Sequence, residues 1–291
     1  MTKLYADLHV HTNFSDGGFS PEEAVRHAKK LGFSAISITD HDSTEGVPAA
    51  LKEGKIQGVE VVPGVELSTE MKTTGESEMH ILGYFINWEN AQFQERLAMF
   101  RKFRQDRGKK IIDKLLKLGL KFDEIRLYEA TGQGNIGRLH FAKALVEQGF
   151  VKDISGAFEK YLGFGKPAYV PKWQLRPEEA ISMILKIGGI PVLAHPHYGN
   201  YANKNVLKSL VSSGLQGLEV WHSNHPQWVV QKYEETAQEF GLIATGGSDC
   251  HGQFGKQPPA MGKVKIPYEV VKKLKLLKQK IEDDNLKILK A

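Results

Sequence analysis

Histidine and carboxylate residues recur at the ends of short apolar runs in this chain. The first group is Asp7-Leu8-His9-Val10-His11, and Asp16 follows a few residues later. Side chains alternate across a strand, so His9 and His11 point to the same side and can reach one metal ion. One such pair is weak evidence, but similar groups recur at Asp40-His41-Asp42, Glu66, His80, His195-Pro196-His197 and Asp249-Cys250-His251. The recurrence predicts a metal centre on which several strands converge.

A mixed histidine and carboxylate donor set favours transition metals over magnesium alone. Imidazole suits zinc and iron, whereas carboxylate suits manganese and magnesium. Two cations joined by a carboxylate bridge lie roughly 3.5–4 Å apart, the separation used in two-metal hydrolysis of phosphate esters. Such cations polarise the phosphoryl oxygens and activate a water, so no protein nucleophile is required. Asp40, beside His41, is a candidate to orient an imidazole from outside the metal's own ligands.

Alternating helix and strand signals predict how these groups are positioned. The first strand is predicted at Lys3–His9, and Ser20-Pro21-Glu22-Glu23 then opens a helix as a capping box with proline at its first position. Phe33–Thr39 is a continuous apolar run typical of a buried parallel strand. Further strands are predicted at 59–65, 79–86, 190–194, 218–221 and 242–246, with helices at 48–53, 203–213 and 226–240 and a helix start at 176–179. About seven strands would surround one barrel whose mouth, at the carboxyl ends of the strands, carries the chemistry.

Two connections depart from this alternation. The polar stretch Leu67–Glu78 has no helical pattern, so a regular crossover into the fourth strand is not expected. Residues 88–172 contain no strand signal and predict a helical insertion with helices at 93–118, 123–131, 138–148 and 153–162, whose core would include Phe93, Phe100 and Phe103. The turn Gly132–Gly137 resembles a phosphate loop, but it lacks a preceding strand and the Walker lysine and is interpreted as a helix connection. The barrel would therefore comprise residues 1–87 and 173–291.

Composition limits the possible partners and compartment. The net charge of the 291 residues is +5, and the segment from Lys263 onwards alone has nine lysines against four acidic residues. The rest is formally neutral, so overall basicity is poor evidence for a polyanionic partner. No apolar run approaches the roughly 20 residues that span a bilayer, and the start of the sequence has no signal-peptide pattern. The single cysteine, Cys250, excludes an intrachain disulfide, and a cytoplasmic location is expected.

The motifs together resemble those of the PHP (polymerase and histidinol phosphatase) superfamily. The matching stretches, in family order, are Asp7–Thr12 with Ser15–Gly17, Ile38–Asp42, Gly64–Glu66, Met79–Tyr84, Ala194–Pro196 and Gly247–His251. Within the superfamily the chain is most similar to the TrpH/YciV-type branch, which includes nucleoside 3′,5′-bisphosphate phosphatases and 5′→3′ exoribonucleases. The resemblance implies a distorted (β/α)7 barrel of PHP type with two to three divalent ions, which are manganese, iron or zinc rather than magnesium.

The resemblance also implies a distribution of ligands. His9, His11, Glu66 and Asp249 would hold a first ion. Glu66 would bridge to a second ion completed by His80 and His195. The third ion would be held by Asp16, His41 and His251.

Phosphate recognition needs donors beyond the metals. Arg138 is the first candidate, because a guanidinium can hold a phosphate through two parallel hydrogen bonds. His140, Lys172, His197 and His222 are further candidates for phosphate binding. A catalytic role is expected for Asp40, His197 and His222, with one histidine protonating the leaving oxygen. The insertion carrying Arg138 would act as a lid that selects the second phosphate of a bisphosphate.

These observations predict a divalent-metal-dependent phosphoesterase that acts on nucleoside 3′,5′-bisphosphates or on short RNA from its 5′ end. No membrane association and no obligate protein partner are expected. Two alternatives stay open. One is a phosphatase of a non-nucleotide ester such as histidinol phosphate, and the other is a metal-stabilised binding module without turnover. The complete set of ligand residues argues against the second alternative.

Overall fold

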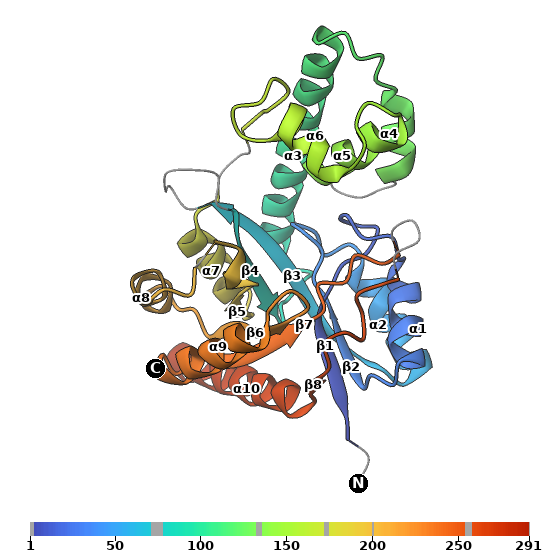
Figure 1. Ribbon diagram of the computed structural model, residues 1–291. Coiled ribbons are helices and arrows are strands. Elements are labelled where there is room, and N and C mark those ends of the chain that lie inside the picture. Colours follow the sequence, from blue (N-terminus) through green and yellow to red (C-terminus); the bar gives the residue numbers. More distant parts are fainter. Residues whose placement is uncertain are drawn as a thin grey trace.

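The computed structural model describes residues 3–70, 78–131, 136–171, 175–199, 201–253 and 258–290. Lys172 and most of the predicted 132–137 turn lie outside these ranges. At the centre is one eight-stranded sheet of order β7-β6-β5-β4-β3-β2-β1-β8 (Figure 1). Its strands are β1 (Tyr5–Val10), β2 (Ala35–Ile38), β3 (Glu60–Glu70), β4 (Glu78–Tyr84), β5 (Ile190–Leu193), β6 (Gly217–His222), β7 (Ile243–Gly247) and β8 (Ile266–Pro267).

The sheet nearly closes into a barrel where the chain beyond β7 returns to β1. Val10 forms a parallel bridge with Cys250. The His11 N–H donates to the Cys250 carbonyl at 2.9 Å, and the Cys250 N–H donates to the His9 carbonyl at 3.3 Å. These contacts confirm the predicted distorted barrel. The eighth strand, β8, was not predicted, because only Ile266 and Pro267 pair with β1.

The sheet is mixed rather than wholly parallel. β3 pairs antiparallel with β4, and β4 pairs antiparallel with β5, whereas the β1–β2, β2–β3, β5–β6 and β6–β7 pairs are parallel. The expectation that no regular crossover leads into β4 is therefore confirmed. β3 extends to Glu70, beyond its predicted end at 65, because the hairpin with β4 pairs those extra residues.

Six helices of the described chain pack around the sheet: α1 (Pro21–Lys30), α2 (Val47–Gln57), α7 (Pro177–Lys186), α8 (Lys204–Ser212), α9 (Gln227–Glu239) and α10 (Glu269–Lys290). The predicted capping box of α1 is confirmed, since the Ser20 side chain accepts the Glu23 N–H and the Glu23 carboxylate accepts the Ser20 N–H. In the part of the chain that is described, no helix combines the length and apolar character needed to cross a membrane.

The segment between β4 and α7 is helical: α3 (Ala91–Lys117), α4 (Glu124–Thr131), α5 (Arg138–Glu147), α6 (Ile154–Ala157) and the π-helical turn η1 (Phe158–Leu162). Figure 1 shows α4, α5 and α6 above the barrel, joined to it by the long α3. The second half of α3 packs with α4 and α5 in a core of their own, which includes Ile111, Leu115 and Phe141.

The first half of α3 belongs to the barrel instead. Phe93 and Phe100 are buried in the cluster that contains Leu67 and Ile184, and Phe103 is 38% exposed. The prediction that these aromatics form the core of the insertion was therefore wrong. With 27 residues, α3 is roughly 40 Å long and can serve two cores in succession.

Candidate metal centre

The predicted ligand residues converge at the end of the barrel that faces the insertion. His9 lies on β1 and His11 directly follows that strand, whereas Glu66 lies on β3 and His80 on β4. His195 and Asp249 follow β5 and β7 with left-handed backbone, at φ 22° and 53°. This conformation is unfavourable for residues other than glycine and concentrates at functional sites, where it fixes the direction of a side chain.

Four donor atoms form what we call the His9 group: His9 Nε2, His11 Nε2, Glu66 Oε2 and Asp249 Oδ1. His9 Nε2 lies 3.1 Å from His11 Nε2, 3.3 Å from Glu66 Oε2 and 3.4 Å from Asp249 Oδ1. His11 Nε2 lies 3.2 Å from the same Glu66 oxygen and 3.1 Å from the same Asp249 oxygen. Four ligands at tetrahedral angles around zinc, with bonds of about 2.0–2.1 Å, would be about 3.3 Å apart. The spacing of the His9 group therefore fits a divalent transition metal.

The other oxygen of Glu66 belongs to a second cluster, the His80 group. Glu66 Oε1 lies 2.9 Å from His80 Nδ1 and 3.0 Å from His195 Nε2, and these two nitrogens are 3.3 Å apart. One carboxylate therefore takes part in both groups, one oxygen in each. That is the arrangement of a bridging ligand between two cations.

The third cluster, the Asp16 group, comprises Asp16, His41, His251 and His11. His251 Nε2 is 3.2 Å from Asp16 Oδ1, and His41 Nε2 is 3.9 Å from Asp16 Oδ2. His41 also approaches the bridging carboxylate, with Nδ1 3.1 Å from Glu66 Oε2. The three groups together contain all nine residues named as ligands from the sequence, and they share side chains with one another.

The charges in this cluster are those of a cation site. Burial opposes ionisation of Glu66, but the surrounding imidazoles hold the pKa of this carboxyl well below its usual range. Burial alone would lower the pKa of His11, yet Asp249 and Glu66 raise it to about 10. His80 behaves similarly, and the Glu66 carboxylate raises its pKa to about 9 against the effect of burial. Without an ion, protons on the imidazoles balance the buried carboxylates, and a bound cation would replace them.

Glu219 orients the His9 imidazole and was not among the site residues predicted from the sequence. Its Oε1 lies 2.9 Å from His9 Nδ1, and its Oε2 accepts the His195 N–H at 2.7 Å. A proton on His9 Nδ1 leaves the Nε2 lone pair directed at the His9 group. Glu219 is wholly buried on β6. The signal that could have revealed it is a carboxylate inside an apolar strand, where an unpaired charge would be costly.

Close packing of β7 on β1 also fixes the position of His9. A Cβ added at Gly247 would lie 2.3 Å from His9 Cβ and 2.4 Å from His9 N. Any larger residue would push β1 away from β7. Gly247 is therefore required for the close approach of these two strands.

Asp40 is buried beside the centre but does not contact an imidazole directly. Its carboxylate accepts hydrogen bonds from the Thr12 N–H at 2.7 Å and from the Thr12 and Ser15 hydroxyls at 2.6 Å each. Ser15 Oγ in turn lies 3.5 Å from His11 Nδ1. Asp40 thus holds the loop after β1 and reaches His11 only through Ser15, because its own hydrogen-bonding capacity is taken up by that loop.

Arg138 and His222 lie beside the ligand cluster. Arg138, at the start of α5, is 3.0 Å through Nη2 from Glu78 Oε1. The His222 Nδ1 accepts the Asn224 N–H at 3.1 Å, and its Nε2 is 3.4 Å from Asp249 Oδ2. Because Nδ1 is an acceptor, Nε2 carries a proton and is directed at Asp249 Oδ2.

Two other predicted residues lie differently from expectation. His140 is buried, and its Nδ1 accepts the Gly137 N–H at 3.0 Å, so it closes the first turn of α5. Burial lowers the pKa of His140 to about 4. His197 is exposed, and its ring packs edge-on against His225 and Trp228 at 5.9 and 5.7 Å. It faces α9 because it follows His195 by two residues in the 3-10 turn η2 (Pro196–Gly199), which redirects the chain. The structure does not bring His197 into the ligand cluster.

Two adjoining cavities open onto the ligands. The larger cavity has a volume of about 490 Å³ and is lined by residues of the His80 group and by Tyr198 and Tyr201. The smaller cavity has a volume of about 170 Å³, and its lining includes Asp16, Arg104 and Arg107. His41, Glu78, His80 and Arg138 line both cavities. Arg104 was missed in the sequence because it reads as one polar residue among many on α3. Its side chain pairs with Asp42 and donates to Ser68 Oγ at 2.8 Å, which joins α3 to the barrel.

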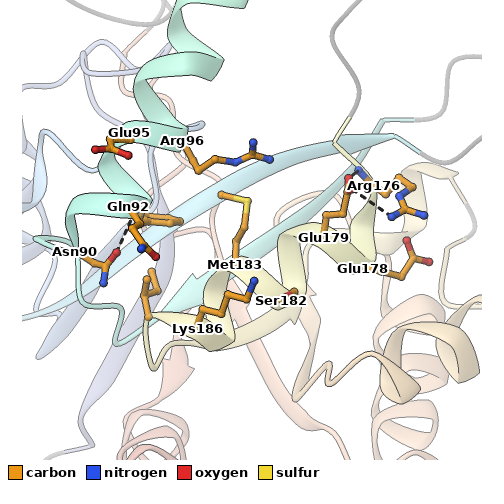
Figure 2. A pocket seen from close by; sticks show the side chains of 12 residues that line it. Asn90, Gln92, Glu95, Arg96, Arg176, Glu178, Glu179, Ser182, Met183 and Lys186 are labelled. Atoms are coloured by element: carbon orange, nitrogen blue, oxygen red, sulfur yellow. Dashed lines mark hydrogen bonds and ion pairs between the residues drawn. The ribbon is translucent and has the colours of Figure 1, made fainter.

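A separate groove of about 650 Å³ lies between α3 and α7 (Figure 2). Its described lining has three basic and three acidic side chains, including the Arg176–Glu179 pair at 3.2 Å, but no histidine or cysteine. It lacks the convergent donors that distinguish the strand ends. The chemistry is therefore assigned to the ligand cluster.

Comparison with known proteins agrees with this geometry. The model of the PHP domain matches residues 7–169, more than half of the chain. A 5′-3′ exoribonuclease from Haemophilus influenzae is 35% identical over 88% of this chain and 92% of its own length. A 3′,5′-nucleoside bisphosphate phosphatase from Chromobacterium violaceum is 32% identical over 86% of this chain and 89% of its own. A crystal structure described as that of a metal-dependent phosphoesterase from Bifidobacterium adolescentis superposes with a TM-score of 0.83 at 28% identity, covering 92% of this chain and 94% of the other.

Proposed function

The chain belongs to the PHP family and is a metal-dependent phosphoesterase, and on that premise we propose that it hydrolyses nucleoside 3′,5′-bisphosphates or removes nucleotides from the 5′ end of short RNA. The observation that carries the proposal is the shared carboxylate of Glu66, which joins the His9 and His80 groups beside Arg138. Two-cation centres of this kind hydrolyse phosphate esters. The two relatives, named for a bisphosphate phosphatase and an exoribonuclease, support nucleotide substrates.

We assign one ion to the His9 group, a second to the His80 group and a third to the Asp16 group. The mixed imidazole and carboxylate donors suit manganese, iron or zinc better than magnesium. Bound divalent ions supply charge neutralisation for the phosphoryl oxygens and lower the pKa of water in the site. Glu66 would hold both ions of the pair, and Glu219 keeps His9 in the tautomer that offers Nε2.

His222 is assigned to position Asp249, because its side chain is fully buried and is not part of the described lining of either cavity. Its Nε2 lies 3.4 Å from Asp249 Oδ2, while its Nδ1 is occupied by the Asn224 N–H. This buried position does not support the catalytic role expected for His222 from the sequence, so protonation of the leaving oxygen is assigned to solvent.

Arg138 is assigned to the phosphate that is not cleaved. It lies at the junction of the two cavities, and its guanidinium forms charge-assisted hydrogen bonds, as the pair with Glu78 shows. The insertion (88–172) that carries Arg138 serves as a lid over the barrel mouth. Substrates with a second phosphate would gain this contact, whereas simple monoesters would not.

The test compares three substrates in parallel with manganese present. Phosphate release is measured from adenosine 3′,5′-bisphosphate and from histidinol phosphate, and mononucleotide release is measured from a 5′-phosphorylated RNA dinucleotide. The Asp249→Asn variant gives the background for each substrate. Preference for either nucleotide substrate supports the proposal and separates monomers from chain ends. Turnover of histidinol phosphate alone would refute the nucleotide assignment. No turnover by metal-loaded protein would favour the binding module.

A further inference from the structure

The two cavities at the ligand cluster differ in chemistry at their outer ends. The smaller has Arg104 and Arg107 in the part of its lining that the larger does not share, and Arg138 lines both. The far side of the larger is formed by Tyr198, Gly199 and Tyr201, from η2 and the chain that follows it. The ligands lie between the basic end and the phenolic end. A molecule that spans both cavities would therefore have an anionic group at one end and an apolar, planar group at the other.

Tyr198 presents an aromatic ring at the phenolic end. The residue is 60% exposed, which is unusual for a large aromatic side chain beside a buried cluster. Its ring is nevertheless held in place, since the Asn224 side-chain amide donates to its hydroxyl. The rings of His195 and His222 pack edge-on against it, with centroids 5.3 and 6.0 Å away. Neither ring is parallel to the phenol, so neither is a stacking partner for it.

We propose that Tyr198 is the stacking surface for the nucleobase of the substrate. The inference rests on the proposed function and specifies how the substrate lies in the site. His195 belongs to the His80 group, so a ring stacked on Tyr198 is next to the phosphate being cleaved. The second phosphate of the same nucleotide then lies near Arg138, where the larger cavity meets the smaller, basic one.

Stacking also determines the specificity. Every base has a π-face, so contacts of this kind discriminate little between bases. The enzyme is therefore expected to accept purine and pyrimidine nucleotides alike, and to favour either over a sugar bisphosphate that lacks a base.

The experiment compares kcat/KM for adenosine 3′,5′-bisphosphate with kcat/KM for ribose 3,5-bisphosphate in the wild type, Tyr198→Ala and Tyr198→Phe. The ratio of the two values is the readout, because damage to His195 or to folding affects both substrates and cancels. Base stacking on aromatic side chains contributes about 1–3 kcal/mol per base, so the ratio should fall about 5- to 160-fold in Tyr198→Ala. Tyr198→Phe, which keeps the ring, should retain the wild-type ratio.

Trp228→Ala is the matched control, since Trp228 is an equally exposed aromatic, at 63%, that packs on His197 outside the cavity lining. Its ratio should equal that of the wild type. An unchanged ratio in Tyr198→Ala, with the wild type active on the nucleotide, would overturn the stacking assignment and leave the proposed function intact. A wild type that is inactive on adenosine 3′,5′-bisphosphate and on the RNA dinucleotide would overturn both the proposed function and the stacking assignment.

Discussion

Replacing Glu219 by glutamine should weaken metal binding without removing any metal ligand. Both carboxylate oxygens accept hydrogen bonds in a fully buried position, one from the His9 imidazole and one from the His195 N–H. A glutamine amide has one acceptor oxygen and one NH2 group, so it can satisfy only one of these two donors. The change also removes the negative charge that favours a proton on His9 Nδ1.

The expected magnitude follows from the role of Glu219 beside the His9 group. Loss of a partner that orients a metal-bound histidine typically costs 10–100-fold in metal affinity or activity. A buried donor left without its acceptor costs a further ~1–3 kcal/mol in the stability of the fold, whether or not metal is bound. We therefore expect Mn²⁺ to bind 10–100-fold more weakly, with kcat partly restored at saturating Mn²⁺.

The assay is competition for Mn²⁺ between the protein and a chelating dye, followed by phosphate release across a manganese titration. Glu235→Gln, an exposed site on α9, is the matched control for the loss of one negative charge. If Glu219→Gln bound Mn²⁺ as tightly as the wild type, the role of Glu219 in orienting His9 would be refuted. A loss of kcat that no manganese concentration restores would indicate a role in the reaction beyond holding the ligand.

Three further predictions test other parts of the centre. Arg138→Ala should lower kcat/KM for nucleoside bisphosphates about 10–100-fold, which is the usual contribution of hydrogen bonds to a charged group. The turnover of p-nitrophenyl phosphate should change much less. Unchanged turnover of both substrates would refute the assignment of Arg138 and the lid. Gly247→Ala should lower the stability of the fold by about 1–3 kcal/mol and reduce the manganese content of the protein. The control is Gly156→Ala, whose added methyl meets nothing nearer than 3.4 Å and should change neither property. Thermal melts and metal analysis measure both variants. The pKa values of His11 and His80 are about 10 and about 9 in the ion-free fold, above the ordinary value of 6.5. Protonation of these two residues therefore stabilises the ion-free fold fully below pH 6.5, and this stabilisation is lost as the pH rises through 9–10. Mn²⁺ must displace these protons, so the affinity for Mn²⁺ should rise with pH. Calorimetry at pH 8 in two buffers of different ionisation enthalpy should show proton release on Mn²⁺ binding. Binding without proton release would contradict this prediction.

Much of the fold could be predicted because its signals are local. The capping box at Ser20, the apolar run before His41 and the proline-led start of α7 each predicted an element that the structure contains. The convergence of the ligands could be predicted as well, since chemistry at the carboxyl ends of barrel strands meets at one mouth. Pairing of β8 could not, because two residues carry no pattern.

The residues missed at the site have their roles only in three dimensions. Glu219 reads as part of a core strand until His9, 210 positions away, is placed against it. Arg104 looks like any polar residue of a long helix, and only the packing of α3 on the barrel brings it to Asp42. His197 was predicted at the site but lies away from it: its neighbour His195 belongs to the His80 group, whereas the ring of His197 is turned towards α9 by η2.

The proposed centre has two cations joined by Glu66 and a third beside Asp16. The most direct measurement is anomalous X-ray diffraction near the manganese edge from crystals of the manganese-loaded protein. Two peaks are expected, one in the His9 group and one in the His80 group, each in contact with a different oxygen of Glu66, together with a third peak in the Asp16 group. A single peak that leaves one Glu66 oxygen without metal, or no peak in these groups, would contradict it.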